Sequence, residues 1–350
     1  MSRNARFHSL IFALLGWFVP AWAQDVLPPP ATHSAVRVVV LQDDNLLDAF
    51  LPDEARVAAA FNRGLIYFTR TTSVTNAWRS LVTTNDTVGI KVFSQPGQLS
   101  GTRPAVVAAI VRGLLAAGLV PGQIIIWDKH ADDLRAAGFF SLGRTLGVRV
   151  AGAAEAGYDT NAFYLPDSPV IGQLVWGDLE FGKTNKDFSV GKKSFVSKLV
   201  SRQMTKIISV APLMNENAAG LCGHFFSLAL GSVDNTRRFE DDADRLAVAL
   251  PEIDALPVIG DRVVLHVTDA LLAQYEGGPA GYLQFSTVRN EIWFSNDPVA
   301  LDMLALKDLM DERRLMGAPA MPANFAIYTN AVVLQLGVND PARIRIEKVK

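Results

Sequence analysis

Residues 87–128 read TVGIKVFSQPGQLSGTRPAVVAAIVRGLLAAGLVPGQIIIWD, and this stretch decides the fold class. Its start, 87–93, is short and rich in β-branched residues, which predicts a strand. Thr102 can cap a helix over 103–117, and a second apolar run follows at 124–127. Strand, helix and strand in this order predict a βαβ unit, whose crossover should be right-handed.

The same alternation continues on both sides of this unit. Further strand-like runs lie at 36–41, 170–176, 206–210, 263–267 and 290–294. Helices are predicted at 53–68, 192–204, 218–230 and 297–315. Short apolar strands that alternate with amphipathic helices predict an α/β fold, with a mostly parallel mixed sheet and helices on both faces. We expect a single domain over 36–350, although the length also permits a bilobed arrangement with its boundary near 177–193.

The first residues are typical of a cleavable secretory signal peptide. Arg3 and Arg6 precede the apolar run 10–19, and Ala21-Trp22-Ala23 has the small-x-small form that signal peptidase accepts. We therefore expect a signal peptide over 1–23, an extended proline-containing leader over 24–35, and export to the periplasm or beyond. An uncleaved anchor or a lipid attachment is the alternative. No later stretch is apolar enough to predict a transmembrane segment.

Composition excludes several classes of function. The net charge is −2, and it becomes about −4 without the predicted signal peptide, which argues against nucleic acid as a partner. Cys222 is the only cysteine, so the chain can form no intramolecular disulfide and can hold no iron–sulfur cluster.

A phosphate-loop pattern is present at 177–184, GDLEFGKT, but its chemistry is wrong for a nucleotide. Asp178 and Glu180 would place negative charge where the phosphate must lie. Phe181 is bulky where the backbone must wrap closely. The residues that follow lack helical periodicity, so nucleotide binding is not expected.

Two carboxylates follow predicted strands directly. Asp128 comes after the run 124–127, and Asp269 comes just after the run 263–267. In open α/β sheets ligands bind at the carboxyl ends of strands, so these side chains are candidates for a site. Lys129 and His130 could add a cation and a titratable imidazole there. The alternative is that each carboxylate only caps the turn or helix that follows.

Other candidates lie in polar segments later in the chain. His224 has Asn217 before it and Asn235 after it, although a hydrogen-bonded core histidine is the alternative. The glycine-rich loop 275–281 contains Glu276, Gly277 and Gly278, whose backbone could approach a ligand closely or simply turn. Asp297, before Pro298, is expected to start a helix.

Together these residues resemble the domain of unknown function 362 family, found in bacteria and archaea. The resemblance covers about 88–306 and depends on Val88-Gly89-Ile90-Lys91, Thr102-Arg103-Pro104, Ala117-Gly118 before 124–128, the stretch 228–239, Asp269 through Gly278-Pro279, and 296–302. The chain departs from the family pattern at Val92-Phe93, where many members have proline and asparagine. It departs again at 212–217, where many carry a lysine-rich segment with a histidine. The resemblance implies an exported protein; some relatives carry iron–sulfur domains.

The sequence therefore suggests that a small polar or anionic ligand binds in a cleft at the carboxyl edge of the sheet, with a divalent cation as a further candidate. Lys91 would supply positive charge, and Asp128, Asp269 and Glu276 would supply oxygen ligands or acid/base groups. His130 or His224 would carry protons. The expected ligand contacts are Asn217, Asn235, Gly277, Gly278 and Asp297. Hydrolysis or isomerisation suits these groups; the alternative is a non-catalytic periplasmic binding or assembly protein.

Overall fold

The β-branched runs of the sequence form the strands of one central sheet. The computed structural model describes residues 35–166, 193–320 and 323–350, and the statements below concern these residues. Along the sheet the strand order is β13, β1, β12, β11, β9, β4, β5, β6, and β10 pairs with β9. The bounds are Ile344–Val349 for β13, Val36–Gln42 for β1, Ser286–Ser295 for β12, Val263–Gln274 for β11, Lys206–Glu216 for β9, Val88–Val92 for β4, Ile124–Asp128 for β5, Arg149–Gly152 for β6 and Gly220–Leu221 for β10.

Most neighbouring strands of this sheet are parallel. β11, β9, β4, β5 and β6 run in one direction, and β1 is parallel to β13. β12 is antiparallel to both of its neighbours, β1 and β11. The predicted βαβ unit is present, because β4 pairs in parallel with β5 and helix α3 (Pro104–Ala116) connects them. The predicted fold class, a mostly parallel mixed sheet with helices on both faces, is confirmed.

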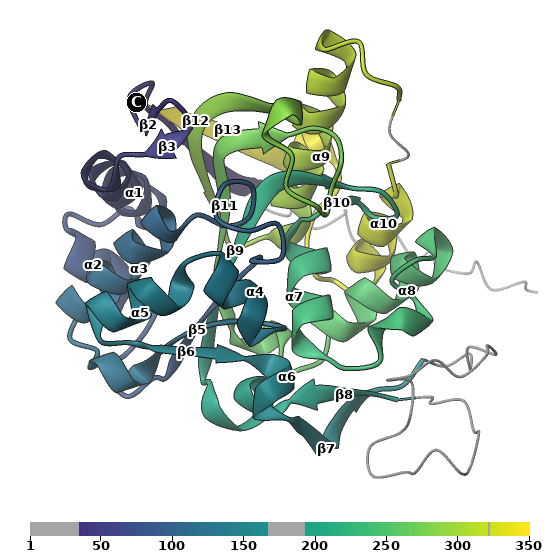
Figure 1. Ribbon diagram of the computed structural model, residues 1–350, viewed down its shortest axis with the longest axis horizontal. Coiled ribbons are helices and arrows are strands. Elements are labelled where there is room, and N and C mark those ends of the chain that lie inside the picture. Colours follow the sequence, from purple (N-terminus) through teal and green to yellow (C-terminus); the bar gives the residue numbers. More distant parts are fainter. Residues whose placement is uncertain (1–34, 167–192, 321–322) are drawn as a thin grey trace, which may run out of the picture. The chain divides into compact units, whose positions relative to one another are not determined.

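Two groups of helices cover the two faces of the sheet (Figure 1). Helices α1, α2, α3 and α5 lie on one side with α4, and α7, α8, α9 and α10 lie on the other. Their bounds are Glu54–Thr69 for α1, Val74–Arg79 for α2, Ala131–Ala136 for α4, Phe139–Leu146 for α5, His224–Ser232 for α7, Ala243–Asp254 for α8, Pro298–Leu315 for α9 and Phe325–Val333 for α10. None of the described helices is long and apolar enough to cross a membrane.

Smaller elements complete the described chain. The short helix α6 covers Ala153–Ala156, and two hairpins pair β2 (Leu47–Asp48) with β3 (Leu51–Pro52) and β7 (Tyr158–Tyr164) with β8 (Ser194–Ser197). Residues Ala35–Lys350 form one compact unit. The predicted signal peptide, nearly all of the leader, the run 170–176, the phosphate-loop pattern 177–184 and almost all of the proposed boundary 177–193 lie outside the described residues.

Alternation along each strand divides the core between the two faces. In β4, Val88, Ile90 and Val92 pack with α3 in one cluster of buried side chains. Lys91, between them, faces the opposite side, because successive side chains of a strand point to opposite faces. Lys91 is also fully buried, so a charged group lies inside the layer that α7 to α10 cover.

Two predicted helices were wrong in part. The segment predicted as a helix over 192–204 contains strand β8 followed by a π-helical segment, Leu199–Gln203. The reason is a long-range pairing, since Phe195 lies opposite Phe163 of β7. The helix predicted over 218–230 begins only at His224, because the residues before it form the β9–β10 hairpin.

Thr102 was wrongly predicted to cap α3. Its hydroxyl donates to the carbonyl of Val210 at 2.7 Å and accepts from the amide of Phe93 at 2.9 Å. Arg103 occupies the cap position instead, without a side-chain bond to the helix. Thr102 therefore connects the end of β4 to the middle of β9 rather than starting the helix.

The start of α7 depends on a carboxylate from another helix. The residue before the helix is Gly223, which has no side chain to bond the free amides of the first turn. Asp302 of α9 accepts from the amides of His224 at 2.8 Å and Phe225 at 3.2 Å. A Cβ on residue 223 would lie 2.5 Å from the atoms of this carboxyl group, so the glycine leaves room for it.

Asp302→Ala should destabilise the protein by about 3 kcal/mol, because it leaves two buried amides without an acceptor. The free energy of unfolding, measured by urea denaturation, checks this. Asp311→Ala, on the same helix and half exposed, is the matched control and should cost about 0.5 kcal/mol or less. Equal effects of the two substitutions would contradict the role assigned to Asp302.

Candidate functional site

A cleft of about 650 Å³ lies where β4, β5 and β9 end. Its walls come from the segments after β4 and β5, from α7, and from the connection between α7 and α8. Six carboxylate residues line it, namely Asp128, Asp133, Glu216, Asp234, Glu240 and Asp241, and we call it the acidic cleft. Four of the candidates from the sequence are among its lining residues: Asp128, Lys129, His130 and Asn235.

Lys91 lies beneath the floor of the acidic cleft rather than in it. Its ammonium group donates to the Val92 carbonyl at 2.7 Å, to Asp128 Oδ1 at 2.8 Å and to Ser227 Oγ at 2.9 Å. All three protons of the ammonium group are therefore used. Burial lowers the pKa of Lys91, and the Asp128 carboxylate opposes this shift. Because α7 carries Gly231 here, the helix can approach closely; a Cβ would lie 2.1 Å from Lys91 Cε.

The carboxylate of Asp128 is saturated with donors. Oδ1 accepts from Lys91 and from the amide of Lys129, and Oδ2 accepts from the amide and the hydroxyl of Ser94, each at 2.7 Å. As expected, Asp128 lies at the carboxyl end of its strand. It ties β5 to Lys91 of β4 and to Ser94, and it retains little capacity to bond a ligand.

A row of polar side chains crosses the sheet beside Lys91. In the strand register, Lys91 of β4 pairs with Ser209 of β9. Ser209 pairs in turn with His266 of β11, and His266 pairs with Ser295 of β12. Neighbouring residues at one level share a face of the sheet. The row therefore lies inside the layer covered by α7 and α9.

His224 lies over this row, in the interior. Its Nδ1 is 2.8 Å from Ser209 Oγ, and its Nε2 is 3.3 Å from Thr268 Oγ1. The His224 and His266 rings meet edge to face at 4.9 Å. Burial lowers the pKa of His224 well below its usual value and that of His266 to about 3, so both rings are neutral at physiological pH. The structure places His224 away from the cleft, in the core, where both of its ring nitrogens have a hydroxyl partner.

Asp269 and Glu276 lie away from the acidic cleft. Asp269 was expected at the end of a strand, but β11 continues to Gln274, so the prediction of its position was wrong. Its carboxylate accepts from the amide of Arg103 at 2.8 Å and from the Arg103 guanidinium at 3.0 Å. This buried pair ties the start of α3 to the sheet. Glu276 is partly exposed and 3.9 Å from Arg313.

The remaining candidates have structural partners or lie apart from the cleft. The amide of Gly278 donates to Asn215 Oδ1 at 3.1 Å, and Gly277 adopts a positive φ of 86° in the same turn. Asp297 starts α9 as predicted, since its Oδ1 accepts from the amide of Ala300 at 2.8 Å. Asn217 is exposed in the turn between β9 and β10. From the glycine-rich loop 275–281, Pro279 lines the acidic cleft.

Sequence reasoning did not select Asp234 and Glu240, two acids that line the cleft. Burial raises the pKa of Asp234 to about 6, although the Phe195 amide, 2.5 Å away, opposes the shift. Lys129 donates to Thr236 Oγ1 at 2.6 Å, and that hydroxyl donates to Glu240 at 2.5 Å. Burial lowers the pKa of Lys129. The available signal was the density of acids over 234–242, a segment that connects two helices.

No three His, Cys, Asp or Glu side chains within the described parts of the chain are arranged to hold a metal ion. Cys222 is buried, and with no second cysteine in the sequence an intramolecular disulfide cannot form.

Comparisons with known proteins do not assign a family. No family model matches the sequence, and no curated protein matches it significantly. One similar solved structure is that of a protein from Thermotoga maritima, which is 12% identical with a TM-score of 0.39. The alignment covers 76% of this chain and 59% of that protein, so the chain spans about three fifths of its length. The resemblance to the domain of unknown function 362 family stays a prediction.

Lys91→Met should destabilise the protein by about 3 kcal/mol, because it leaves the Asp128 carboxylate buried without its counterion. Urea denaturation at neutral pH measures this change. Lys307→Met removes an exposed lysine that pairs with Asp311 on the surface, and it should change the stability by about 0.5 kcal/mol or less. A Lys91→Met protein as stable as this control would show that the buried pair does not hold the floor of the cleft.

The buried His266 should make the protein less stable as the pH falls. Below about pH 6.5 the unfolded chain binds a proton on this imidazole, whereas the folded protein does not until about pH 3. We therefore compare the slope of the free energy of unfolding against pH around pH 5. This slope should be about 1.4 kcal/mol per pH unit smaller in His266→Phe than in the unmodified protein. Phe225→Leu, a change without a titratable group in a hydrophobic core cluster, should lower stability without changing this slope.

Proposed function

We propose that the protein binds a small polar ligand in the acidic cleft, and that this ligand is positively charged or binds together with a divalent cation. The charge of the lining residues carries the proposal. Six carboxylate residues line the cleft, against two basic residues, Lys129 and Arg237. Clefts lined by one sign of charge concentrate ligands of the opposite sign.

The buried state of Lys91 argues against a bare anion as the ligand. The sequence suggested that this lysine would attract negative charge, but its three donor bonds are all made within the protein. A bare anion would meet unbalanced carboxylates, which repel it. A cation, or an anion that arrives with a divalent metal ion, would be attracted.

The size and the walls of the cleft suit a small organic molecule. A volume of about 650 Å³ falls within the usual range of ligand pockets. Phe93, Tyr158 and Phe226 add aromatic surface to the polar lining. Aromatic rings stabilise an adjacent cation, so an amine with an apolar portion fits this lining best.

An enzymatic role would use the titratable groups on the cleft wall. The pKa of Asp234 is raised to about 6, in the range that general acid–base catalysis at neutral pH requires. Hydrolysis or isomerisation of a small substrate is the reaction class that such a group supports. The signal-like segment 1–23 supports export, so we propose that the ligand is met outside the cytoplasm.

A non-catalytic binding protein is the second candidate. The observation in its favour is that Asp128 and Glu216 use their oxygens within the fold. Asp128 accepts four hydrogen bonds, and Glu216 Oε2 accepts from the amides of Ala218 and Ala219. Such carboxylates shape a site without transferring protons.

Calorimetric titration with spermidine, an organic polyamine, and with Mn²⁺ tests the proposed ligand class. We expect at least one of these cations to bind, and to bind about tenfold more weakly to a double variant, Asp234→Asn with Glu240→Gln. Binding should also weaken as salt is added. Asp261→Asn, an exposed acid before β11, should leave the affinity unchanged. Equal binding to all three proteins, or no binding of either cation, would contradict the proposal.

A further inference from the structure

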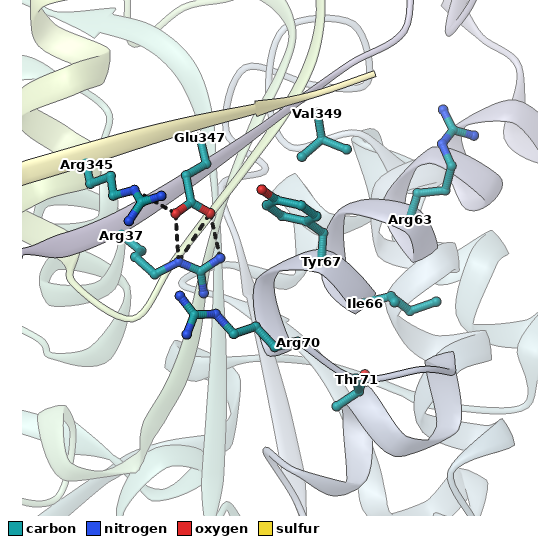
Figure 2. Close-up of a pocket in the computed structure, with 9 residues that line it drawn as sticks. All are labelled: Arg37, Arg63, Ile66, Tyr67, Arg70, Thr71, Arg345, Glu347 and Val349. Atoms are coloured by element: carbon teal, nitrogen blue, oxygen red, sulfur yellow. Dashed lines mark hydrogen bonds and ion pairs between the residues drawn. The ribbon is translucent and has the colours of Figure 1, made fainter.

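A second pocket, of about 660 Å³, lies at the edge of the sheet where α1 ends beside β1 and β13 (Figure 2). Arg37 of β1, Arg345 of β13 and Arg70 after α1 all line it, together with Glu347. We call it the arginine pocket. Its charge has the opposite sign to that of the acidic cleft, so a different class of ligand suits it.

The one carboxylate in the arginine pocket cannot balance its cations. Arg37 Nη2 is 2.7 Å from Glu347 Oε2, and Arg345 Nε is 3.0 Å from Oε1 (Figure 2). These guanidinium groups, Arg37 foremost, lower the pKa of Glu347, which therefore stays ionised. With Arg70 included, three positive charges surround one negative charge. Arg63 also lines the pocket, but it pairs with Asp43 at 2.7 Å.

Arg37 and Arg70 differ in what they do for the fold. Arg37 Nη1 donates to the carbonyl of Phe68 at 3.0 Å, so this side chain secures the end of α1. The Arg70 guanidinium has no hydrogen bond or ion pair with the residues that the structure describes. Only the backbone amide of Arg70 bonds to the last turn of α1. The guanidinium of Arg70 is therefore free to bind a ligand.

The backbone of Arg70 is itself unusual. It adopts a left-handed conformation, φ 54° and ψ 39°, at the position where helices usually end in glycine or asparagine. A residue with a Cβ is strained in this region. The chain thus keeps an arginine where glycine would be more stable, although its guanidinium makes no hydrogen bond or ion pair with the described residues and only its charge acts on Glu347.

From these observations we propose that the arginine pocket binds the oxyanion of a small phosphate or sulfate ester. The planar guanidinium group can donate two parallel hydrogen bonds to two oxygens of a tetrahedral oxyanion, whereas a lysine ammonium group acts as a point charge. Ile66, Tyr67 and Val349 form the apolar part of the lining. They can cover the organic group of an ester, whereas inorganic phosphate would leave them bare.

Calorimetric titration of the full chain with phenyl phosphate, phenyl sulfate and inorganic phosphate tests this site. We expect at least one ester to bind more tightly than inorganic phosphate, and its affinity to fall as salt is added. Arg70→Gly is the decisive variant, because it removes the guanidinium and relieves the strained backbone. It should bind the ester about tenfold more weakly or worse while its melting temperature stays equal or rises.

Arg144→Gln is the matched control, since Arg144 is an exposed arginine on α5 outside the pocket. Its affinity for the ester should equal that of the unmodified protein. The proposal is overturned if neither ester binds at millimolar concentration, or if Arg70→Gly binds the ester as tightly as the control does. Inorganic phosphate that binds as tightly as both esters would overturn the assignment to an ester.

Discussion

The buried ammonium group of Lys91 is the constraint on which the arrangement around the cleft depends. A lysine with no exposure to water needs three acceptors, because an unpaired buried charge is very unfavourable. Those acceptors come from Val92 at the end of β4, from Asp128 at the end of β5 and from Ser227 on α7. Two strand ends and one helix are thereby fixed relative to one another. The close approach of α7 requires a glycine at residue 231, and together these contacts form the floor of the acidic cleft.

The polar groups buried under α7 and α9 also need hydrogen-bond partners from the protein. His224 reaches hydroxyl groups on β9 and β11, and Asp302 of α9 supplies acceptors for the first turn of α7. Each polar group in such a layer is unfavourable to bury alone, but a satisfied network makes one arrangement of the helices preferable to others. The interior polar residues therefore position the walls of the cleft, while the groups that meet a ligand lie above them.

Local signals in the sequence were sufficient for the sheet and for part of the site. The β-branched runs and the βαβ spacing predicted β4, α3 and β5, and Asp128 lies at the strand end where it was expected. Contacts between distant residues were not predictable. Phe195 is as apolar in a helix as in a strand, and only its pairing with β7 makes the segment a strand. Thr102 bonds to Val210, and Asp269 bonds to Arg103, across more than a hundred residues in each case.

The difference between a structural and a functional charge lies in the bonding capacity that the fold leaves unused. Asp128 and Asp269 have the residue type and nearly the position of ligand-binding carboxylates, yet their oxygens are occupied by donors from the protein. Asp234, Glu240 and Asp241 line the cleft instead, in the connection between α7 and α8. The same criterion separates Arg37, which bonds α1 and Glu347, from Arg70, whose guanidinium has no partner in the described chain. Residue type can be read from the sequence, but occupancy depends on partners that only the folded chain brings within reach. Candidate sites should therefore be sought at accessible charged side chains whose hydrogen-bonding capacity is not used within the protein.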